Sequence, residues 1–113
     1  MSQITTHILD TSLGKPAAHV PVQLEHKAAN GSWTIIAQGT TNADGRVSDL
    51  LEKNAVLALV IYKMVFDTEG YFKNQNIKGF YPTVEIQFYV SDNAHYHVPL
   101  LLNPFGFSTY RGS

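Results

Sequence analysis

Two histidines near the end of the chain are spaced to project from the same side of one β-strand. Residues 95–102 alternate, and every second residue contributes to an apolar face: Tyr96, Val98, Leu100 and Leu102. His95 and His97 therefore lie together on the other face, beside Pro99. Imidazoles titrate near neutral pH, so this pair suits either general acid–base chemistry or a metal ion. Because proline removes a ladder hydrogen bond, we expect an edge strand or a locally irregular one.

A third histidine, His7, lies close to the N-terminus. By alternation, one face of its strand holds Ile4, Thr6 and Ile8. Thr5 and His7 then share the other face, so we expect His7 to point away from the core. With His95 and His97 it would supply three imidazoles for zinc or copper, although no carboxylate or cysteine completes a specific ligand set.

The chain has two arginines, and both lie in segments that stand out for other reasons. Arg46 follows a turn at residues 42–45, in which Gly45 permits a left-handed bend and holds Arg46 at a sheet edge. Arg111 belongs to the terminal stretch, residues 108–113. A guanidinium binds planar acceptors such as carboxylates, imides and oxyanions. The alternative interpretation is an ordinary hairpin turn and a frayed chain end.

Two-residue alternation continues through most of the chain and indicates strands rather than helices. We expect seven or eight strands, including residues 20–27, 33–41, 57–66, 83–90, 95–102 and 105–111. Asn30-Gly31 predicts a tight hairpin between the first two of these, and Asp67 or Thr68 is placed to cap one short helix. Many short strands with turn signals at close spacing are typical of a β-sandwich.

Composition limits the classes of function. The 113 residues fit a single domain, residues 1–113, and the absence of cysteine excludes disulfides and thiolate metal sites. The net charge of -1 argues against nucleic acid and anionic membranes as partners, because both require a basic excess. The longest apolar run, residues 55–62, is too short to span a bilayer.

The N-terminal residues show no basic region followed by an apolar stretch, so no signal peptide is visible. We therefore expect a cytoplasmic protein. A periplasmic protein whose leader has been removed would have the same sequence.

Charged residues are scarce, at 15% of the chain against about 25% in a typical soluble domain. One explanation is a surface built from Thr, Asn, Ser and Gln. The other is that part of the surface is buried against further copies of the chain.

Four segments closely resemble the 5-hydroxyisourate hydrolases, the transthyretin-related proteins of urate breakdown. They are Thr5-Thr6-His7-Ile8-Leu9-Asp10-Thr11-Ser12-Leu13-Gly14-Lys15-Pro16-Ala17, Asn42-Ala43-Asp44-Gly45-Arg46, residues 95–102 and the closing Tyr110-Arg111-Gly112-Ser113. The likeness runs through essentially the whole chain. It implies a mainly β, transthyretin-like (prealbumin-like) sandwich of two four-stranded sheets with one short helix. It also implies a homotetramer, a dimer of dimers, with active sites in a channel where dimers meet.

The same resemblance implies a reaction. The family hydrolyses 5-hydroxyisourate to 2-oxo-4-hydroxy-4-carboxy-5-ureidoimidazoline in purine degradation, with no metal or other cofactor. Its catalytic set falls on His7, Arg46, His97 and Ser113, while Tyr110, with His7 and Arg46, holds the substrate. We expect His7 or His97 to take a proton from the attacking water, and Ser113 to fix one imidazole through its hydroxyl and the terminal carboxylate. His95 matches a family position whose role the resemblance does not give.

Two alternatives stay open at this point. The transthyretin fold also serves non-catalytic carriage of small ligands, and fold alone does not distinguish carrier from enzyme. The second alternative is a metal-binding sandwich that uses His7, His95 and His97.

Overall fold

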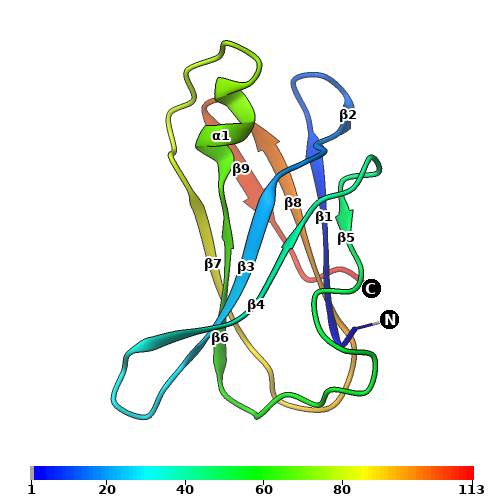
Figure 1. Cartoon of the computed structure of the whole chain (residues 1–113), viewed down its shortest axis with the longest axis vertical. Helices are drawn as coiled ribbons and strands as arrows, with labels where there is room; N and C mark the ends of the chain where they lie inside the picture. The colour runs from blue at the N-terminus through cyan, green and yellow to red at the C-terminus, as the bar shows by residue number, and fades with distance from the viewer. Residues whose placement is uncertain (1) are drawn as a thin grey trace.

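Nine strands and one short helix make up the structure, a computed structural model that describes residues 2–113 (Figure 1). In chain order the elements are β1 (Ile4–Asp10), β2 (Lys15–Pro16), β3 (Pro21–Lys27), β4 (Trp33–Thr40), β5 (Arg46–Val47), β6 (Ile61–Phe66), α1 (Thr68–Lys73), β7 (Val84–Tyr89), β8 (Tyr96–Asn103) and β9 (Gly106–Thr109). Within the described residues, no helix is both long and apolar enough to cross a membrane.

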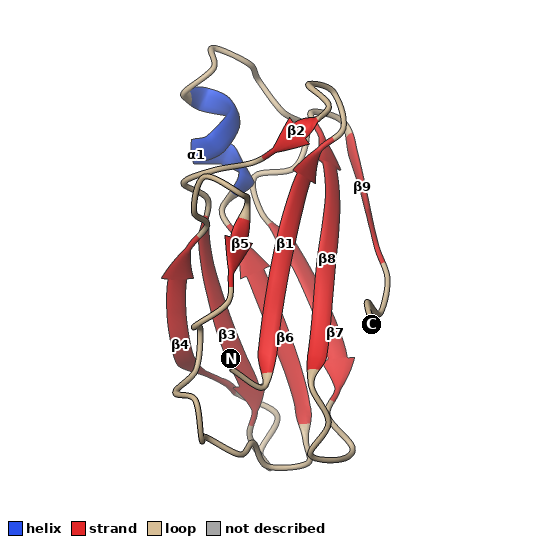
Figure 2. Cartoon of the chain, turned by 90° about the vertical axis from the view of Figure 1, so that its right-hand side faces the viewer, coloured by secondary structure: helices blue, strands red, loops and turns tan. Residues whose placement is uncertain are grey.

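The strands form two sheets that pack face to face (Figure 2). One sheet has the order β4-β3-β6-β7, with every neighbouring pair antiparallel. The other has the order β2-β1-β8-β9, in which β1 and β8 run parallel and β5 joins the edge of β1 that β2 also pairs with. The predicted sandwich is confirmed, and the two-residue strand β5 is an addition to its two four-stranded sheets.

Alternation on the strands decides which side chains enter the core. Fully buried residues come from the faces that the sequence predicts to be apolar, among them Ile4, Ile8, Val22, Leu24, Leu100 and Leu102. Burial of each such side chain contributes about 1.5–3 kcal/mol. His7 and His97, on the opposite faces of β1 and β8, are only half-buried. The predicted outward orientation of both histidines is therefore confirmed.

The short helix begins where the sequence predicts. The Asp67 side chain caps it by accepting a hydrogen bond from the Gly70 N–H at 3.2 Å. The helix buries Phe72, while the Tyr71 hydroxyl donates to Asp10 Oδ2 at 2.7 Å. Asp10 is itself fully buried at the end of β1. This hydrogen bond fastens the helix to the sheet that carries the histidines.

The strand predicted at residues 57–66 is shorter than expected, because it begins only at Ile61. Its neighbours explain the difference: Ile61 pairs with Tyr89, the last residue of β7, so residues before Ile61 have no strand beside them. Val56 and Leu59 are 68% and 61% exposed. An apolar run without ladder partners forms a loop here.

Pro99 interrupts a strand that is not at an edge. β8 lies between β1 and β9, so the edge-strand interpretation is wrong and the irregular one is correct. The ladder between β8 and β9 ends at the pair Leu100–Thr109, next to Pro99. Beyond Pro99, a single bridge joins His97 to Gly112 in the same register. The Thr109 hydroxyl donates to the Pro99 carbonyl at 2.7 Å, so this carbonyl has a partner although Pro99 has no N–H to donate to the ladder.

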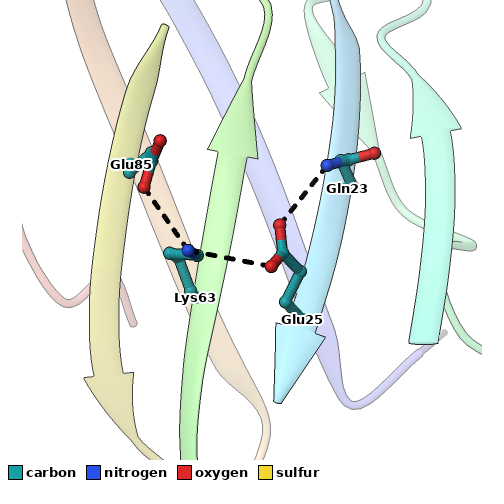
Figure 3. Close-up of polar contacts among 4 residues, drawn as sticks. All are labelled: Gln23, Glu25, Lys63 and Glu85. Atoms are coloured by element: carbon teal, nitrogen blue, oxygen red, sulfur yellow. Dashed lines mark hydrogen bonds and ion pairs between the residues drawn. The ribbon is translucent and has the colours of Figure 1, made fainter. Parts of the chain in front are cut away.

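Charged side chains gather on the outer face of the other sheet (Figure 3). Lys63 Nζ lies 3.7 Å from Glu25 and 3.4 Å from Glu85, on the two strands beside its own. The same ammonium lies 4.5 Å from the centre of the Trp33 ring. These cross-strand contacts form a charged cluster in which the Lys63 and Glu25 side chains are only 14% and 12% exposed, and no histidine takes part in it.

Candidate active site

Strand pairing brings the predicted site residues onto one face of the first sheet. His7 lies directly opposite Arg46 in the β1–β5 pair, and Thr5 lies opposite His97 in the β1–β8 pair. Side chains of directly opposed residues share a face, and so do residues two apart on one strand. Three strands therefore present His7, Arg46 and His97 together on the outer surface of the sandwich.

The turn before Arg46 has little freedom to change. Gly45 has φ +74°, and a Cβ atom there would lie 2.5 Å from the Ile8 carbonyl oxygen. The close approach arises because the Ile8 N–H donates to the Gly45 carbonyl at 2.8 Å. Asn42 Oδ1 accepts hydrogen bonds from the backbone N–H groups of Asp44 and Arg46. The predicted left-handed turn is confirmed, and it fixes the backbone that carries Arg46.

The electrostatics of the site keep two imidazoles neutral. Burial lowers the pKa of His7 below its usual value, and the Arg46 guanidinium lowers it further against a smaller opposing effect of Asp44. Burial also lowers the pKa of His97, followed by the charge of Arg46 and then by His95 and His7. Neutral imidazoles are the form needed to accept a proton near pH 7.

A hydroxyl that the sequence analysis did not assign lies between two of the histidines. Thr5 Oγ1 is 2.8 Å from His97 Nδ1 and 2.9 Å from His95 Nε2. The two rings are nearly parallel, with centroids 6.4 Å apart. Thr5 occupies one nitrogen of His97, so Nε2 is the nitrogen left for chemistry. The sequence feature that points to Thr5 is its position two residues before His7, on the same face of the strand.

The C-terminal residues pack directly against His97. The Gly112 N–H donates to the His97 carbonyl at 2.8 Å, and a Cβ atom on Gly112 would lie 2.5 Å from His97 Cδ2. One residue earlier, the Arg111 guanidinium lies 4.5 Å from the centre of the Tyr96 ring. These contacts hold the chain end beside the imidazole, so no side chain larger than hydrogen fits at Gly112.

The two remaining predicted site residues, Tyr110 and Ser113, lie at the chain end. Gly112, not Tyr110, is opposite His97, and the same register puts Tyr110 beside Pro99. Tyr110 and His97 still line one groove between β7 and the chain end. Ser113 is exposed, and within residues 2–113 it forms no hydrogen bond with an imidazole. Thr5, rather than Ser113, fixes the His97 ring within one chain.

The three histidines do not converge on a single point. Among the described residues, no three His, Asp or Glu side chains are close enough to share a metal ion. Thr5 instead occupies one ring nitrogen of both His95 and His97.

The topology and this site define a transthyretin-like protein. The solved structure of sea bream transthyretin in complex with thyroxine matches with a TM-score of 0.92 at 33% identity, over 98% of this chain and 95% of that one. The structure of Klebsiella pneumoniae 5-hydroxyisourate hydrolase matches with a TM-score of 0.85 at 34% identity, over 97% and 98% of the two chains.

The family follows from the sequence comparisons. The model of the HIUase/Transthyretin family matches residues 4–112, and the chain belongs to this family. The 5-hydroxyisourate hydrolase of Salmonella dublin is 45% identical over 111 residues, which span 97% of this chain and 80% of that protein. The resemblance found in the sequence is therefore confirmed.

Proposed function

We propose that this chain is a hydrolase that opens the ring of 5-hydroxyisourate. The observation that carries the proposal is the placement of His7, Arg46 and His97 on one outer face, in a chain 45% identical to a 5-hydroxyisourate hydrolase. Water adds to a ring carbonyl carbon, the amide C–N bond breaks, and the nitrogen leaves with a proton. The proposed product is 2-oxo-4-hydroxy-4-carboxy-5-ureidoimidazoline, which places the reaction in urate degradation.

His97 is the proposed general base. Its Nδ1 is engaged by Thr5, so Nε2 is free to take the proton of the attacking water. Such proton transfer contributes about 10²- to 10⁴-fold to a rate. The lowered pKa of His97 supports this role, because it keeps the ring unprotonated near neutral pH.

Arg46 and His7 are proposed to assist the attack of water on the ring carbonyl. The Arg46 guanidinium, fixed by its turn, binds the planar substrate and stabilises negative charge on the carbonyl oxygen. His7 lies opposite Arg46 and, as a neutral imidazole, is proposed to orient the attacking water. His97 then passes the proton it has taken from the water to the leaving nitrogen. Tyr110 lies opposite Pro99, two residues along β8 from His97, and is proposed to hold the substrate on this outer face. Ser113, one residue beyond Gly112, contributes its hydroxyl to the substrate or water.

A homotetramer is proposed as the working form. The site faces outward from a single sandwich, so water would reach it freely in an isolated chain. Strands β7 and β9 are unpaired sheet edges, and Tyr89 and Phe105 beside them are 74% and 72% exposed. Pairing of such edges between copies would cover this apolar surface and form a dimer, and two dimers joined across their outer sheet faces would enclose the site.

Non-catalytic carriage of a small ligand is the second candidate function. It is favoured by the likeness to a transthyretin solved with thyroxine, whose TM-score of 0.92 exceeds that of the hydrolase. The imidazoles and guanidinium of the outer face favour hydrolysis, since a carrier site needs no proton acceptor. A hydrolase converts the bound molecule to product, whereas a carrier releases it unaltered.

The test is product analysis in H₂¹⁸O with 5-hydroxyisourate freshly made by urate oxidase. Hydrolysis predicts one ¹⁸O atom in the new carboxylate, formed faster with protein than without it. Tight binding of 5-hydroxyisourate or thyroxine with no faster ring opening would instead support the carrier.

A further inference from the structure

Thr5 bridges His95 and His97 in a way that restricts where their protons lie. Its hydroxyl is within hydrogen-bond distance of His95 Nε2 and of His97 Nδ1, and Thr5 is 6% exposed. The parallel β1–β8 register places Thr5 directly opposite His97, so the backbone fixes this contact. His95 is exposed at the outer end of the bridge.

A count of protons leaves two arrangements. The Thr5 hydroxyl has one proton, so it donates to one ring nitrogen and accepts an N–H from the other. If both rings donated, the Thr5 proton would have no acceptor among its observed partners, which is costly for a shielded hydroxyl. The two histidines therefore carry their protons at matching positions, both on Nδ1 or both on Nε2.

We propose that Thr5 is a positioning residue that couples the tautomers of His95 and His97 and holds both protons on Nδ1. In this arrangement His97 Nδ1–H donates to Thr5, Thr5 donates to His95 Nε2, and His97 Nε2 presents its lone pair. His95 accepts the Thr5 proton and so keeps that proton away from His97. The effect of this coupling on catalysis rests on the proposed function. The assignment of the tautomers does not depend on that function.

The surroundings favour this arrangement over its reverse. The exposed His95 can place its Nδ1–H in water at little cost, so protonation at Nδ1 suits that ring. Arg46 shares the outer face with His97, and its positive charge favours an outward lone pair over an outward N–H. Proton transfer from water to Nε2 also leaves every hydrogen bond of the bridge unchanged, because Nδ1 already carries its proton.

Kinetics on 5-hydroxyisourate test the catalytic part. Thr5→Val keeps the shape but removes the hydroxyl, and it should lower kcat about 10- to 100-fold with little change in KM, as loss of a histidine's orienting partner does. Thr5→Ser should retain most of the rate. His95→Phe frees the Thr5 proton to turn to His97 Nδ1 and should also lower kcat. The double variant should be no slower than Thr5→Val alone.

Thr6→Val is the matched control. Thr6 lies on the same strand but faces the core, where its hydroxyl donates to the Val98 carbonyl. It should change stability without a selective loss of kcat. Equal kcat for Thr5→Val and the wild type, or fully additive losses in the double variant, would overturn the coupling in catalysis.

Nitrogen NMR of protein with ¹⁵N-labelled histidine tests the tautomers without substrate. Signals of His97 and His95 are assigned by their loss in His97→Asn and His95→Phe. The wild type should show Nδ1–H and unprotonated Nε2 in both rings, and Thr5→Val and His95→Phe should shift His97 toward Nε2–H. A wild-type His97 with Nε2–H, or one unaffected by both variants, would overturn the proposal. These readouts hold even if 5-hydroxyisourate is not the substrate.

Discussion

His97 has one ring nitrogen, Nε2, that Thr5 leaves free, because the Thr5 hydroxyl engages Nδ1. His7 and Arg46 reach the same face from the neighbouring strand and turn. At this scale the important property is protonation: burial and Arg46 together lower the pKa values of both imidazoles. Neutral histidine accepts a proton, whereas protonated histidine does not.

The pH dependence of kcat/KM follows from these shifts. An essential base whose pKa lies below its usual value of 6.5 is already unprotonated at pH 7. We predict that kcat/KM rises with pH, reaches half its maximum below pH 6.5, and levels off towards neutrality. The measurement is kcat/KM from acid to neutral pH, corrected at each pH for spontaneous decay of the substrate. A midpoint above 6.5 would contradict the assignment of His97 as the base.

At the scale of elements, two attachments to the first sheet shape the site. The chain end lies along β8, held by the Gly112 N–H and by Arg111 on the Tyr96 ring. Helix α1 is held at the end of β1 by Tyr71 and Asp10. Asp10 also accepts hydrogen bonds from Ser12 and from the Leu13 N–H.

Gly112→Ala tests the first attachment. The new methyl group would meet His97 Cδ2 at 2.5 Å, so the ring or the chain end must move. A misplaced catalytic group costs about 10²-fold, and we predict a loss of that order in kcat. Gly106→Ala in β9 is the matched control, because its Cβ atom would meet only Asn103 at 3.8 Å. Equal activity of the two variants would contradict close packing of Gly112 on His97.

Tyr71→Phe tests the second attachment. It leaves a buried carboxylate oxygen of Asp10 without its partner and should lower the free energy of unfolding by about 1–3 kcal/mol. Burial raises the pKa of Asp10, but hydrogen bonds from Ser12, Tyr71 and Leu13 outweigh burial and leave it below 3.8. The stabilisation is therefore present above pH 3.8 and is lost as pH falls through the lower folded value.

Urea unfolding of both proteins at one protein concentration measures this difference. It should be largest near neutral pH and shrink below about pH 4. The exposed Tyr81 gives a matched control, Tyr81→Phe, which should cost little. A constant difference at all pH values would exclude Asp10 ionisation as the cause.

Local signals predicted most of the strands and the helix, because alternation and capping depend only on neighbouring residues. They also placed His7 and His97 correctly on the outer face and Arg46 at a sheet edge. The contacts of Thr5 with the two histidines could not be predicted, since they depend on parallel pairing between β1 and β8. Thr5 and His95 are 90 residues apart in the sequence. Strand β5 is two residues long, too short for alternation to reveal. Local signals also do not give the register of the chain end, which puts Gly112 rather than Tyr110 opposite His97.

At the scale of the whole molecule, the low content of charged residues is accompanied by exposed aromatic side chains. An aromatic cluster of Phe80, Tyr81 and Phe107 lies outside the core, with ring centroids 5.0 and 5.5 Å apart in successive pairs. Tyr89 projects from the unpaired edge strand β7. Burial of these side chains between copies would explain why few charges are needed.

Sedimentation velocity tests this explanation. We predict a species of about four times the 12.5 kDa chain mass. Tyr89→Lys should shift the protein toward smaller species, because a charge on an edge strand opposes pairing. A stable wild-type monomer would contradict the tetramer and leave the polar surface as the whole explanation for the low charge content.

The most direct test of the central claim is the initial rate of 5-hydroxyisourate decay, followed by absorbance, with wild type, His97→Asn and Arg46→Ala. The wild type should accelerate decay well above the spontaneous rate. His97→Asn should lose about 10²- to 10⁴-fold, as for removal of a general base, and Arg46→Ala about 10²- to 10³-fold, as for removal of an oxyanion donor. No acceleration by the wild type, or equal rates for wild type and His97→Asn, would contradict the proposed hydrolase.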